Sequence, residues 1–375
     1  MSAARILFAG GGTGGHLYPA LALASAVQAE RPGTEVHFAG ALRGVEARVL
    51  PQQGVPHTLL PFQPLFRDRV WRNWQIPFAL AASFRGLARL FAAFRPQLVV
   101  GTGGYASGPA CFYGLLHGTP VAVQEQNSYP GMTTRLLARR ARQLHLGFPE
   151  ALRYLKPGPR TRVFELGNPV RTPDLSLDRA ECRRGFGIAP AGTVVLVTGG
   201  SQGARAVNAA LAAALERVAA GELPPPPAGL ELLWATGPTH VEAISRQLAP
   251  LALGWVHVRG YIEDMPRALA AADVALSRAG ASTTAELLAW GIPAVLVPFP
   301  AAAANHQDFN ARALAEAGAA LYLPETELTP ERLWRDLLAL AADRARRERM
   351  TAAALQRARP DAARDIARHL LELMP

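Results

Sequence analysis

Two glycine-rich stretches of the chain have the composition of phosphate-binding loops. The first runs from Gly10 to His16 and follows the apolar run Ile6 to Ala9. The second runs from Gly199 to Arg205 and follows the apolar run Val194 to Thr198. Glycine lets a backbone turn tightly and approach a ligand, and the helix expected after each loop leaves N–H groups free for an anion. The chain therefore uses the same strand, loop and helix device twice.

The first loop also fits the spacing of a dinucleotide-binding motif. Gly10, Gly12 and Gly15 match the G-x-G-x-x-G pattern of nicotinamide enzymes. Those enzymes hold the ribose with an Asp or Glu at the end of the second strand. The second expected strand ends in Phe38-Ala39-Gly40, without an acid. The pattern is weak support for a dehydrogenase because its confirming residue is missing.

Apolar runs and amphipathic stretches alternate along both halves of the chain, which indicates parallel sheets covered by helices on both faces. The first two helices with a clear apolar pattern are expected from His16 and from Pro77, and a basic helix is expected over 131–142. Gly and Pro punctuate the chain at 167–171, where the halves meet. We predict an α/β protein with Rossmann-like domains at 1–168 and 169–355, and a C-terminal helix at 356–375 that can pack back on the first domain.

Open parallel sheets bind ligands beyond the carboxyl ends of their strands. If the two domains face each other, the loops that follow the expected strands would line one cleft, which is the expected active site. These loops are 10–16, 103–109, 125–127, 199–205, 262–264, 278–286 and 300–307.

Length and composition favour a folded globular protein. The chain has 375 residues, of which 50% are hydrophobic and 18% charged. Cys111 and Cys182 lie far apart and lack metal-ligand spacing, so we expect reduced thiols in a cytosolic protein. The start has no signal-peptide pattern, and no uninterrupted apolar run reaches the ~20 residues of a membrane span. We expect a soluble or peripheral protein.

The excess of positive over negative charge lies entirely in the first half of the chain. Residues 1–170 hold 18 Lys and Arg against 7 Asp and Glu, whereas residues 171–375 hold 21 against 22. Aromatic and basic residues interleave over 62–95, where Asp68 is the only acid. Rings suit the headgroup boundary of a membrane and arginines suit anionic lipids. The expected membrane contacts are Trp71, Arg72, Trp74, Phe78, Arg85 and Arg89.

The helix expected from Pro77 also carries an apolar stripe. Its members recur at three- and four-residue steps, which predicts that they face the core. They are Leu80, Phe84, Leu87, Phe91 and Phe94.

Six motifs together resemble the MurG family of UDP-N-acetylglucosamine transferases. The motifs are Gly-Gly-Thr-Gly-Gly-His at 11–16, Gly-Gly-Tyr-x-Ser-Gly-Pro at 103–109, Glu-Gln-Asn at 125–127, Gly-Asn-Pro-Val-Arg at 167–171, Gly-Gly-Ser-Gln-Gly-Ala-Arg at 199–205 and Asn-His-Gln at 305–307. They span both expected domains in the family's order. The resemblance implies a two-domain GT-B glycosyltransferase that moves N-acetylglucosamine, with inversion, from UDP-N-acetylglucosamine to an undecaprenyl-linked muramyl-peptide in peptidoglycan synthesis.

The resemblance also implies which residues bind the donor. Ile262 would read uracil through its backbone, and Glu286 would accept both ribose hydroxyls. Arg171 and the 199–203 loop would bring charge and N–H donors to the leaving pyrophosphate. By residue type alone, Glu286 also suits a first-turn carboxylate and Ser201 a helix cap. The full donor set is Thr13, Gly14, Gly15, Asn127, Arg171, Ser201, Ile262, Ala281, Ser282, Thr283, Thr284, Ala285, Glu286 and Gln307.

On the acceptor side, the first loop is expected to orient the acceptor pyrophosphate and to bring His16 near the attacking hydroxyl. Such an attack needs a base. His16 has a suitable side chain and Glu125 is its rival, a choice that the residues leave open. No Asp-x-Asp pair occurs in the chain, so we expect neither a required metal nor a cofactor. The acceptor set is Gly12, His16, Gly103, Gly104, Tyr105 and Ser107.

Two other classes of function remain open from the sequence. One is a UDP-N-acetylglucosamine epimerase or hydrolase of the same fold. The other is a non-enzymatic basic protein that binds membrane or nucleic acid, which would explain the charge but not the paired glycine loops. The leading hypothesis has UDP-N-acetylglucosamine, the lipid-linked acceptor and an anionic inner leaflet as partners, without nucleic acid. It locates the protein peripherally on the cytoplasmic face of the inner membrane.

Overall fold

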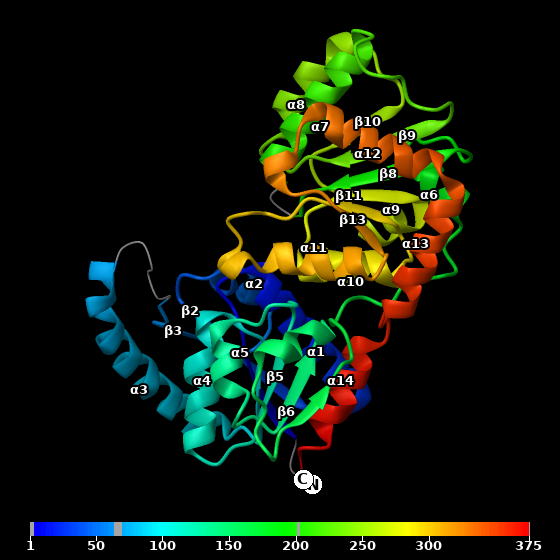
Figure 1. Ribbon diagram of the computed structural model, residues 1–375. Coiled ribbons are helices and arrows are strands. Elements are labelled where there is room, and N and C mark those ends of the chain that lie inside the picture. Colours follow the sequence, from blue (N-terminus) through cyan, green and yellow to red (C-terminus); the bar gives the residue numbers. More distant parts are fainter. Residues whose placement is uncertain (1–3, 64–69, 201–202, 375) are drawn as a thin grey trace. The chain divides into compact units, whose positions relative to one another are not determined.

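The structure is a computed structural model that describes residues 4–63, 70–200 and 203–374 (Figure 1). The chain divides into two compact units. Unit 1 comprises Met1–Arg171 and Asp361–Pro375, and unit 2 comprises Thr172–Pro360. The boundaries expected from the sequence, after residues 168 and 355, precede these by a few residues. The C-terminal segment therefore belongs to the same unit as the first loop.

Unit 1 is built on a parallel sheet that, in the described residues, has seven strands in the order β3-β2-β1-β4-β5-β6-β7. Its elements are β1 (Arg5–Ala9), α1 (Gly14–Glu30), β2 (Glu35–Ala41), α2 (Glu46–Gln52), β3 (His57–Leu60), η1 (Val70–Gln75), α3 (Ile76–Phe94), β4 (Leu98–Gly101), α4 (Gly104–Leu116), β5 (Val121–Glu125), α5 (Met132–Leu137), β6 (Gln143–Leu146), η2 (Pro149–Tyr154), β7 (Arg162–Phe164) and α14 (Ala362–Leu371).

Unit 2 repeats the design with a parallel sheet of six described strands in the order β10-β9-β8-β11-β12-β13. Its elements are α6 (Arg179–Gly185), β8 (Thr193–Thr198), α7 (Arg205–Ala219), β9 (Leu230–Ala235), α8 (Val241–Leu248), η3 (Ala249–Leu251), β10 (Val256–Arg259), α9 (Met265–Ala271), β11 (Val274–Ser277), α10 (Ala281–Ala289), β12 (Ala294–Leu296), η4 (Ala303–Asn305), α11 (His306–Glu316), β13 (Ala320–Tyr322), η5 (Glu325–Glu327), α12 (Pro330–Ala342) and α13 (Arg344–Arg357).

The central strands are apolar throughout because both of their faces are covered. In β1, Leu7 and Ala9 belong to one hydrophobic cluster, and Ile6 and Phe8 belong to another. Alternate side chains of a strand point to opposite faces, so these clusters are the two layers between sheet and helices. Parallel sheets need this double cover, which explains the uninterrupted apolar runs of the sequence.

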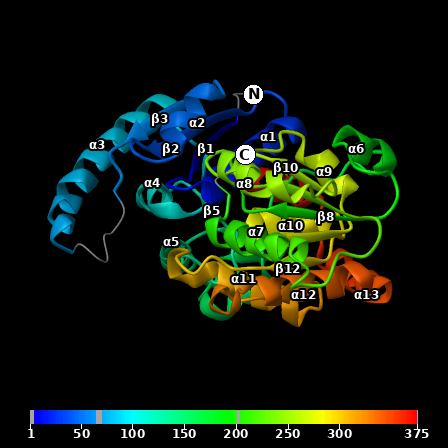
Figure 2. The ribbon, with the colours of Figure 1, turned by 90° about the horizontal axis from the view of Figure 1, so that it is seen from above.

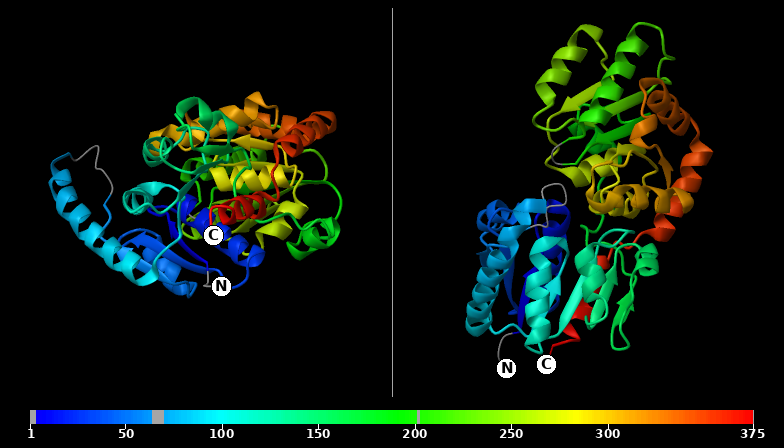
Figure 3. Two further views of the ribbon diagram at one scale, coloured as in Figure 1. Left: turned by 90° about the horizontal axis from the view of Figure 1, so that it is seen from below. Right: turned by 60° about the vertical axis from the view of Figure 1, so that its left-hand side comes forward.

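The last helix, α14, completes the core of unit 1 by packing against α1 (Figure 3). Ile366, Ala367 and Leu370 are buried in the cluster that contains the α1 side chains. An ion pair between Arg368 and Glu30, 2.8 Å from Nε to Oε2, ties the two helices at the surface. Unit 1 is thus formed from the two ends of the chain.

Some expected helix limits differ from the observed ones. α1 begins at Gly14, two residues before His16, so the histidine lies inside the first turn. The basic helix ends at Leu137 rather than at residue 142, because the chain turns there and Arg142 N–H donates to Val121 O at the start of β6.

Leu80 in α3 is a wrong prediction, since 42% of its surface is exposed rather than buried. The N-terminal part of α3 runs out beyond the sheet of its own unit (Figure 2). Burial begins further along the helix, at Ser83, Leu87 and Leu90. Only the C-terminal part of the predicted apolar stripe therefore reaches the core.

Candidate active site

In unit 1 two loops meet where the strand order reverses. β1 lies between β2 and β4, so the loop after β1 and the loop after β4 leave the sheet side by side. Such a switch point is the usual ligand site of an open parallel sheet. It brings Gly10–Gly12 and His16 next to Thr102–Gly104, so two of the loops expected to line the active site do lie together.

Glycine is required where these two loops touch. Gly103 and Gly104 have φ angles of +95° and +76°, and a Cβ at Gly103 would lie 2.8 Å from His16 Nδ1. A Cβ at Gly104 would strike the carbonyl oxygen of Gly11, and one at Gly10 would strike the Thr102 hydroxyl. Thr102 Oγ1 also donates to His16 O over 2.8 Å. The two loops therefore pack so closely at Gly10, Gly103 and Gly104 that a side chain at any of these positions would clash.

His16 is half-buried, with one ring nitrogen turned inward. Its Nδ1 lies 2.9 Å from Gln126 Oε1 and 3.1 Å from Thr102 O. Both neighbours are acceptors, so Nδ1 carries the hydrogen and Nε2 carries the lone pair. Within the described part of the chain, Nε2 has no hydrogen-bond partner. The ring is therefore arranged to accept a proton at Nε2.

Glu125, the rival base, is buried and fully bonded. Its Oε1 accepts from the backbone N–H and the side-chain amide of Asn127, at 3.1 and 3.3 Å. Its Oε2 accepts from Gly131 N at 3.0 Å and from Thr134 Oγ1 at 2.6 Å. The carboxylate braces the 125–134 loop, and this geometry does not support it as a base.

A carboxylate that the sequence did not suggest lies under the first glycine loop. Glu46 opens α2 and is completely buried. It accepts from Gly12 N, at 2.9 Å to Oε2 and 3.1 Å to Oε1, and from Ala41 N at 2.9 Å. A Cβ at Gly11 or Gly44 would strike this carboxylate. The Gly12 N–H, which a phosphate would use in a dinucleotide enzyme, is already bonded inside the protein.

The remaining acceptor candidates differ in how accessible they are. The ring of Tyr105 covers Gly12, whose φ of +87° excludes other residues. Burial, and then the charge of Glu46, raise the pKa of Tyr105, so its hydroxyl stays a donor. Ser107 is completely buried and donates to Gly104 O at 3.1 Å. The Ser107 hydroxyl is therefore buried and bonded within α4, and this geometry does not support its contact with the acceptor substrate.

In unit 2 the corresponding switch point lies between β8 and β11. The second glycine loop follows β8, and the 278–281 segment, which leads into α10, follows β11. The predicted donor residue Ser201 lies outside the described residues. Two of its neighbours, Gly200 and Gly203, have φ angles of +79° and +74°, so the loop needs glycine on both sides.

Glu286 is the strongest site candidate in unit 2. It lies in α10 and is half-buried, and burial raises the pKa of its carboxyl to about 7. Among the described residues its carboxylate has no hydrogen-bond partner. A carboxylate held in this way can accept from two hydroxyls of a ligand.

The other residues of this helix start contribute unequally. Ser282, Thr283 and Ala285 are half-buried, as is Ala281. Thr284 is completely buried, and its hydroxyl donates to Gly280 O and Ala281 O at 3.1 and 3.0 Å. The Thr284 side chain therefore bonds within its own helix rather than facing a ligand.

Gln307 and Ile262 present fixed polar groups. Gln307 Oε1 accepts from Phe299 N at 3.0 Å, which turns the Nε2 hydrogens outward. The Ile262 side chain is buried, whereas its backbone N–H and carbonyl have no partner in the described chain. Both arrangements suit contact with a ligand.

The last donor candidates lie in unit 1. Thr13 and Gly15 are exposed at the start of α1, with Gly14 half-buried between them, and Asn127 is bonded to Glu125. Arg171 is exposed at the end of the first segment of unit 1. The described residues contain no cluster of His, Cys, Asp and Glu that could hold a metal ion.

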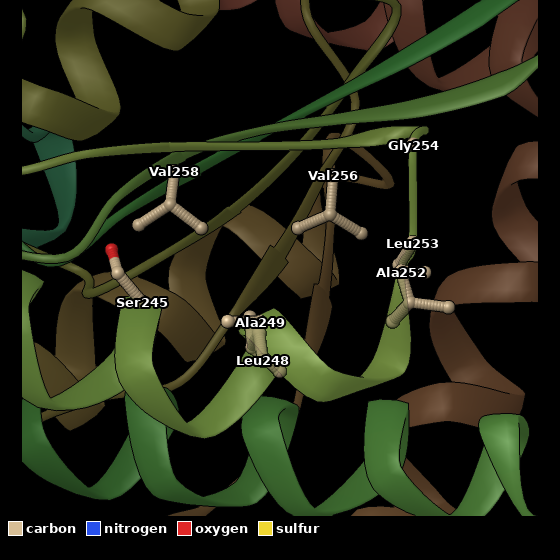
Figure 4. A pocket seen from close by; sticks show the side chains of 8 residues that line it. All are labelled: Ser245, Leu248, Ala249, Ala252, Leu253, Gly254, Val256 and Val258. Atoms are coloured by element: carbon tan, nitrogen blue, oxygen red, sulfur yellow. The ribbon is translucent and has the colours of Figure 1, made fainter.

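Unit 2 also contains a hollow away from its switch point, and this hollow has almost no polar side chains. It has a volume of about 410 Å³ and lies between α8, η3 and the edge strand β10 (Figure 4). Val256 and Val258 line it from the strand, and Leu248 lines it from the helix. One hydroxyl, that of Ser245, is its only polar side chain, so it offers no groups for catalysis.

Two parallel-sheet domains, each with a pair of loops at its switch point, are the architecture of the GT-B fold, as the sequence predicted. Residues 6–146 match the glycosyltransferase family 28 N-terminal domain, and residues 194–366 match the family's C-terminal domain. The chain is 42% identical to a UDP-N-acetylglucosamine-N-acetylmuramyl-(pentapeptide) pyrophosphoryl-undecaprenol N-acetylglucosamine transferase of Moorella thermoacetica, over 98% of each chain. It is also 42% identical to the transferase of that name in Salinibacter ruber, over 99% of this chain and 97% of the relative. The chain therefore belongs to glycosyltransferase family 28 and, within it, to the MurG family.

Solved structures agree with this membership. Acinetobacter baumannii MurG aligns with a TM-score of 0.77 and 29% identity, over 98% of this chain and 99% of that one. A putative UDP-N-acetylglucosamine 2-epimerase from Listeria monocytogenes aligns with a TM-score of 0.67 at 15% identity, over 98% and 95%. The second likeness shows the fold alone.

Proposed function

We propose that this protein is an inverting hexosyltransferase that moves N-acetylglucosamine from UDP-N-acetylglucosamine to the muramyl hydroxyl of undecaprenyl-pyrophosphoryl-muramyl-pentapeptide. The product is the lipid-linked disaccharide of peptidoglycan synthesis. The observation that carries the proposal is the 42% identity to curated transferases of that name, from one end of the chain to the other.

The chemistry can be written with the residues of unit 1. His16 Nε2 takes the proton of the acceptor hydroxyl while the hydroxyl oxygen bonds to the anomeric carbon of N-acetylglucosamine. The bond from that carbon to the phosphate oxygen breaks, and UDP leaves with its electron pair. The free N–H groups at the start of α1, beyond Gly12, orient the acceptor pyrophosphate. Glu125 keeps the neighbouring loop in shape.

Donor binding falls mainly to unit 2. Glu286 accepts from the ribose hydroxyls, the Ile262 backbone reads uracil, and Gln307 donates to the sugar. The loop that contains Ser201, together with Arg171, neutralises the leaving diphosphate. The raised pKa of Glu286 and its lack of a partner within the described chain support the ribose assignment.

We also propose that unit 1 binds an anionic membrane peripherally, on the cytoplasmic face of the inner membrane. Trp71, Trp74 and Phe78 have 72%, 66% and 71% of their surface exposed, which is unusual for large apolar side chains. Arg85 and Arg89 are exposed on α3, the helix of Phe78, and Trp71 and Trp74 lie in η1 directly before it. The side chain of Arg72, the remaining predicted contact, lies outside the described part of the structure.

Two further observations bear on the membrane proposal. By length and composition, Asn73–Phe94 could cross a membrane, but Leu87 and Leu90 pack it into the core of unit 1. A groove of about 600 Å³ at the C-terminal end of α4 combines apolar side chains with Arg139, Arg140, Arg142 and Arg160. Apolar and basic groups together favour contact with anionic lipid over a membrane span.

A transfer assay with labelled UDP-N-acetylglucosamine and the lipid-linked muramyl-peptide tests the proposed function. We expect label in the lipid only when the acceptor is present. Consumption of the donor without acceptor would instead identify an epimerase or hydrolase. Flotation with vesicles tests the membrane face, and replacing Trp71 and Trp74 with serine should reduce binding to anionic vesicles. Equal binding to neutral and anionic vesicles would contradict the electrostatic part.

A further inference from the structure

The half-buried ring of His16 depends on a buried side chain that the family resemblance did not single out. Gln126 is 1% exposed and places Oε1 2.9 Å from His16 Nδ1. The carbonyl of Thr102 is a second acceptor for Nδ1, at 3.1 Å. A histidine with two acceptors at one nitrogen keeps its hydrogen there, which fixes the other nitrogen as the base.

The orientation of the Gln126 amide is determined by its surroundings. Its Nε2 donates to Thr102 O at 2.8 Å and to Gln124 O at 3.1 Å, and it also contacts Gln124 Oε1. If the amide were turned over, its oxygen would face three other oxygens and its NH₂ would face the imidazole. Only the observed orientation pairs donors with acceptors, so Oε1 must point at His16.

A second layer of buried amides holds Gln126 in place. Gln124 Nε2 donates to Asn168 Oδ1 at 3.0 Å, and Asn168 Nδ2 donates back to Gln126 O at 2.9 Å. Gly103 completes the arrangement, because a Cβ there would intrude between His16 and Gln126. Every member of this network is neutral. It can therefore hold a hydrogen bond but cannot take the proton away from the ring.

We propose that Gln126 is a positioning residue that selects the His16 tautomer with hydrogen on Nδ1, leaving the Nε2 lone pair for the acceptor hydroxyl. The inference rests on the proposed function, in which His16 is the base. It adds that a neutral amide, rather than a carboxylate, determines which ring nitrogen of His16 acts as the base.

The first test reads the tautomer directly. Wild-type protein labelled with ¹⁵N-histidine is compared with the His16→Gln variant to assign the ring signals, at a pH where the ring is neutral and without substrate. We expect a protonated-type Nδ1 and a lone-pair-type Nε2. A hydrogen on Nε2 in the wild type would overturn the proposal. Because no acceptor is needed, this result stands apart from any failure of the transfer assay.

The second test uses two matched glutamines. Gln126→Met keeps the shape of the side chain and removes the acceptor, whereas Thr102 O still faces the ring. We expect kcat to fall about tenfold with both KM values within about twofold, and a mixture of His16 tautomers by NMR. Gln143→Met is the control. Gln143 is also buried and accepts from a histidine, His145 Nε2, at 3.0 Å, but it lies at the amino end of β6, away from the loops that follow the strands.

We expect Gln143→Met to lower stability but to leave kcat within about twofold of the wild type. Equal losses of kcat in the two variants would show a merely structural role and overturn the proposal, as would an unchanged tautomer in Gln126→Met. If Gln126→Met does not fold, a hydrogen on Nε2 in the wild type would still overturn the proposal.

Discussion

The two glycine loops have similar sequences but different internal partners. In the first loop, the Gly12 N–H is bonded to the buried carboxylate of Glu46. In the second, Gly200 N–H donates to the Thr198 hydroxyl at 3.4 Å and Gly203 N–H donates to Gly200 O at 3.0 Å, and the described residues place no carboxylate against the loop. A buried carboxylate neutralises the first loop, whereas none of the described carboxylates lies against the second.

This difference suggests that the two strand, loop and helix segments serve different purposes. With Glu46 bonded in place, the first loop is a rigid support that sets His16 against Thr102 and Gln126. A glycine loop that leads into a helix without an internal carboxylate favours an external anion, because no internal negative charge competes with a phosphate there. The comparison supports the proposal that the first loop serves proton transfer and the second binds the donor diphosphate, and four experiments can break or sharpen it.

The largest effect is expected from His16→Gln, which removes the base but keeps a polar side chain. We expect kcat to fall about 10³-fold, with the KM for the donor little changed, because general bases contribute about 10²–10⁴-fold. Steady-state transfer kinetics provide the measurement. A loss confined to donor affinity would move the histidine to the donor side and break the comparison.

Glu286→Ala should have the next largest effect, on donor binding. Losing a carboxylate that accepts two hydroxyls should lower kcat/KM for the donor about 100-fold, near the lower limit for two charged hydrogen bonds at roughly 1.5–3 kcal/mol each. Competition by UDP reports the same loss without catalysis. The matched control is Glu316→Ala on the exposed side of α11, which should change neither quantity.

Donor affinity should also depend on pH through Glu286. Its pKa of about 7 means that the carboxyl is protonated below neutrality, when it accepts fewer hydrogen bonds. We expect affinity for UDP-N-acetylglucosamine to weaken up to tenfold per unit as the pH falls below about 7, and to level off above it. Titration calorimetry should show proton release on binding near pH 7. Glu286→Gln should abolish both effects.

Without ligand, the raised pKa of Glu286 makes folding stability change with pH in the direction opposite to donor affinity. Between the unfolded value of 4.5 and the folded value of about 7, the native state binds more protons than the unfolded state. The stability contributed by this group is present below pH 4.5 and is lost as the pH rises through about 7.

The smallest effect on catalysis should come from Glu46→Gln, which tests the occupied loop. The change keeps the size of the side chain but opposes an NH₂ group to the Gly12 N–H or the Ala41 N–H. We expect the free energy of unfolding to fall by about 1–3 kcal/mol in urea titrations, and kcat to fall only a few-fold. The exposed Glu35→Gln variant on β2 should stay within about 0.5 kcal/mol. A Glu46→Gln variant as stable as the wild type would contradict this interpretation of the first loop.

The sequence predicted the sheets well because their signals are local. Apolar runs such as 194–198 and the glycines that follow them identify strand ends without knowledge of their neighbours. Glu46 escaped prediction because its partner, Gly12, is 34 positions away and only the β2 to α2 turn brings them together. Gln126 was visible in its motif, but its link to His16 spans 110 positions.

Side-chain accessibility was the other quantity that patterns could not supply. Ser107 and Thr284 have hydroxyls that suit ligand contact, yet both are spent on carbonyls of their own helices. Leu80 continues an apolar period that the helix follows beyond the edge of its sheet. Hydrogen bonds within the helix decided the outcome for the two hydroxyls, and the edge of the sheet decided it for Leu80.

The return of α14 to unit 1 decides how this protein can be dissected. A fragment ending at residue 171 would lack Ile366, Ala367 and Leu370, and would expose the apolar face of α1 that they cover. Fusing residues 361–375 behind residue 171 through a short linker would restore that cover in a single polypeptide. Conversely, a fragment of residues 172–360 carries the sheet of unit 2 and its helices, so a polypeptide meant to contain unit 2 alone should end before α14.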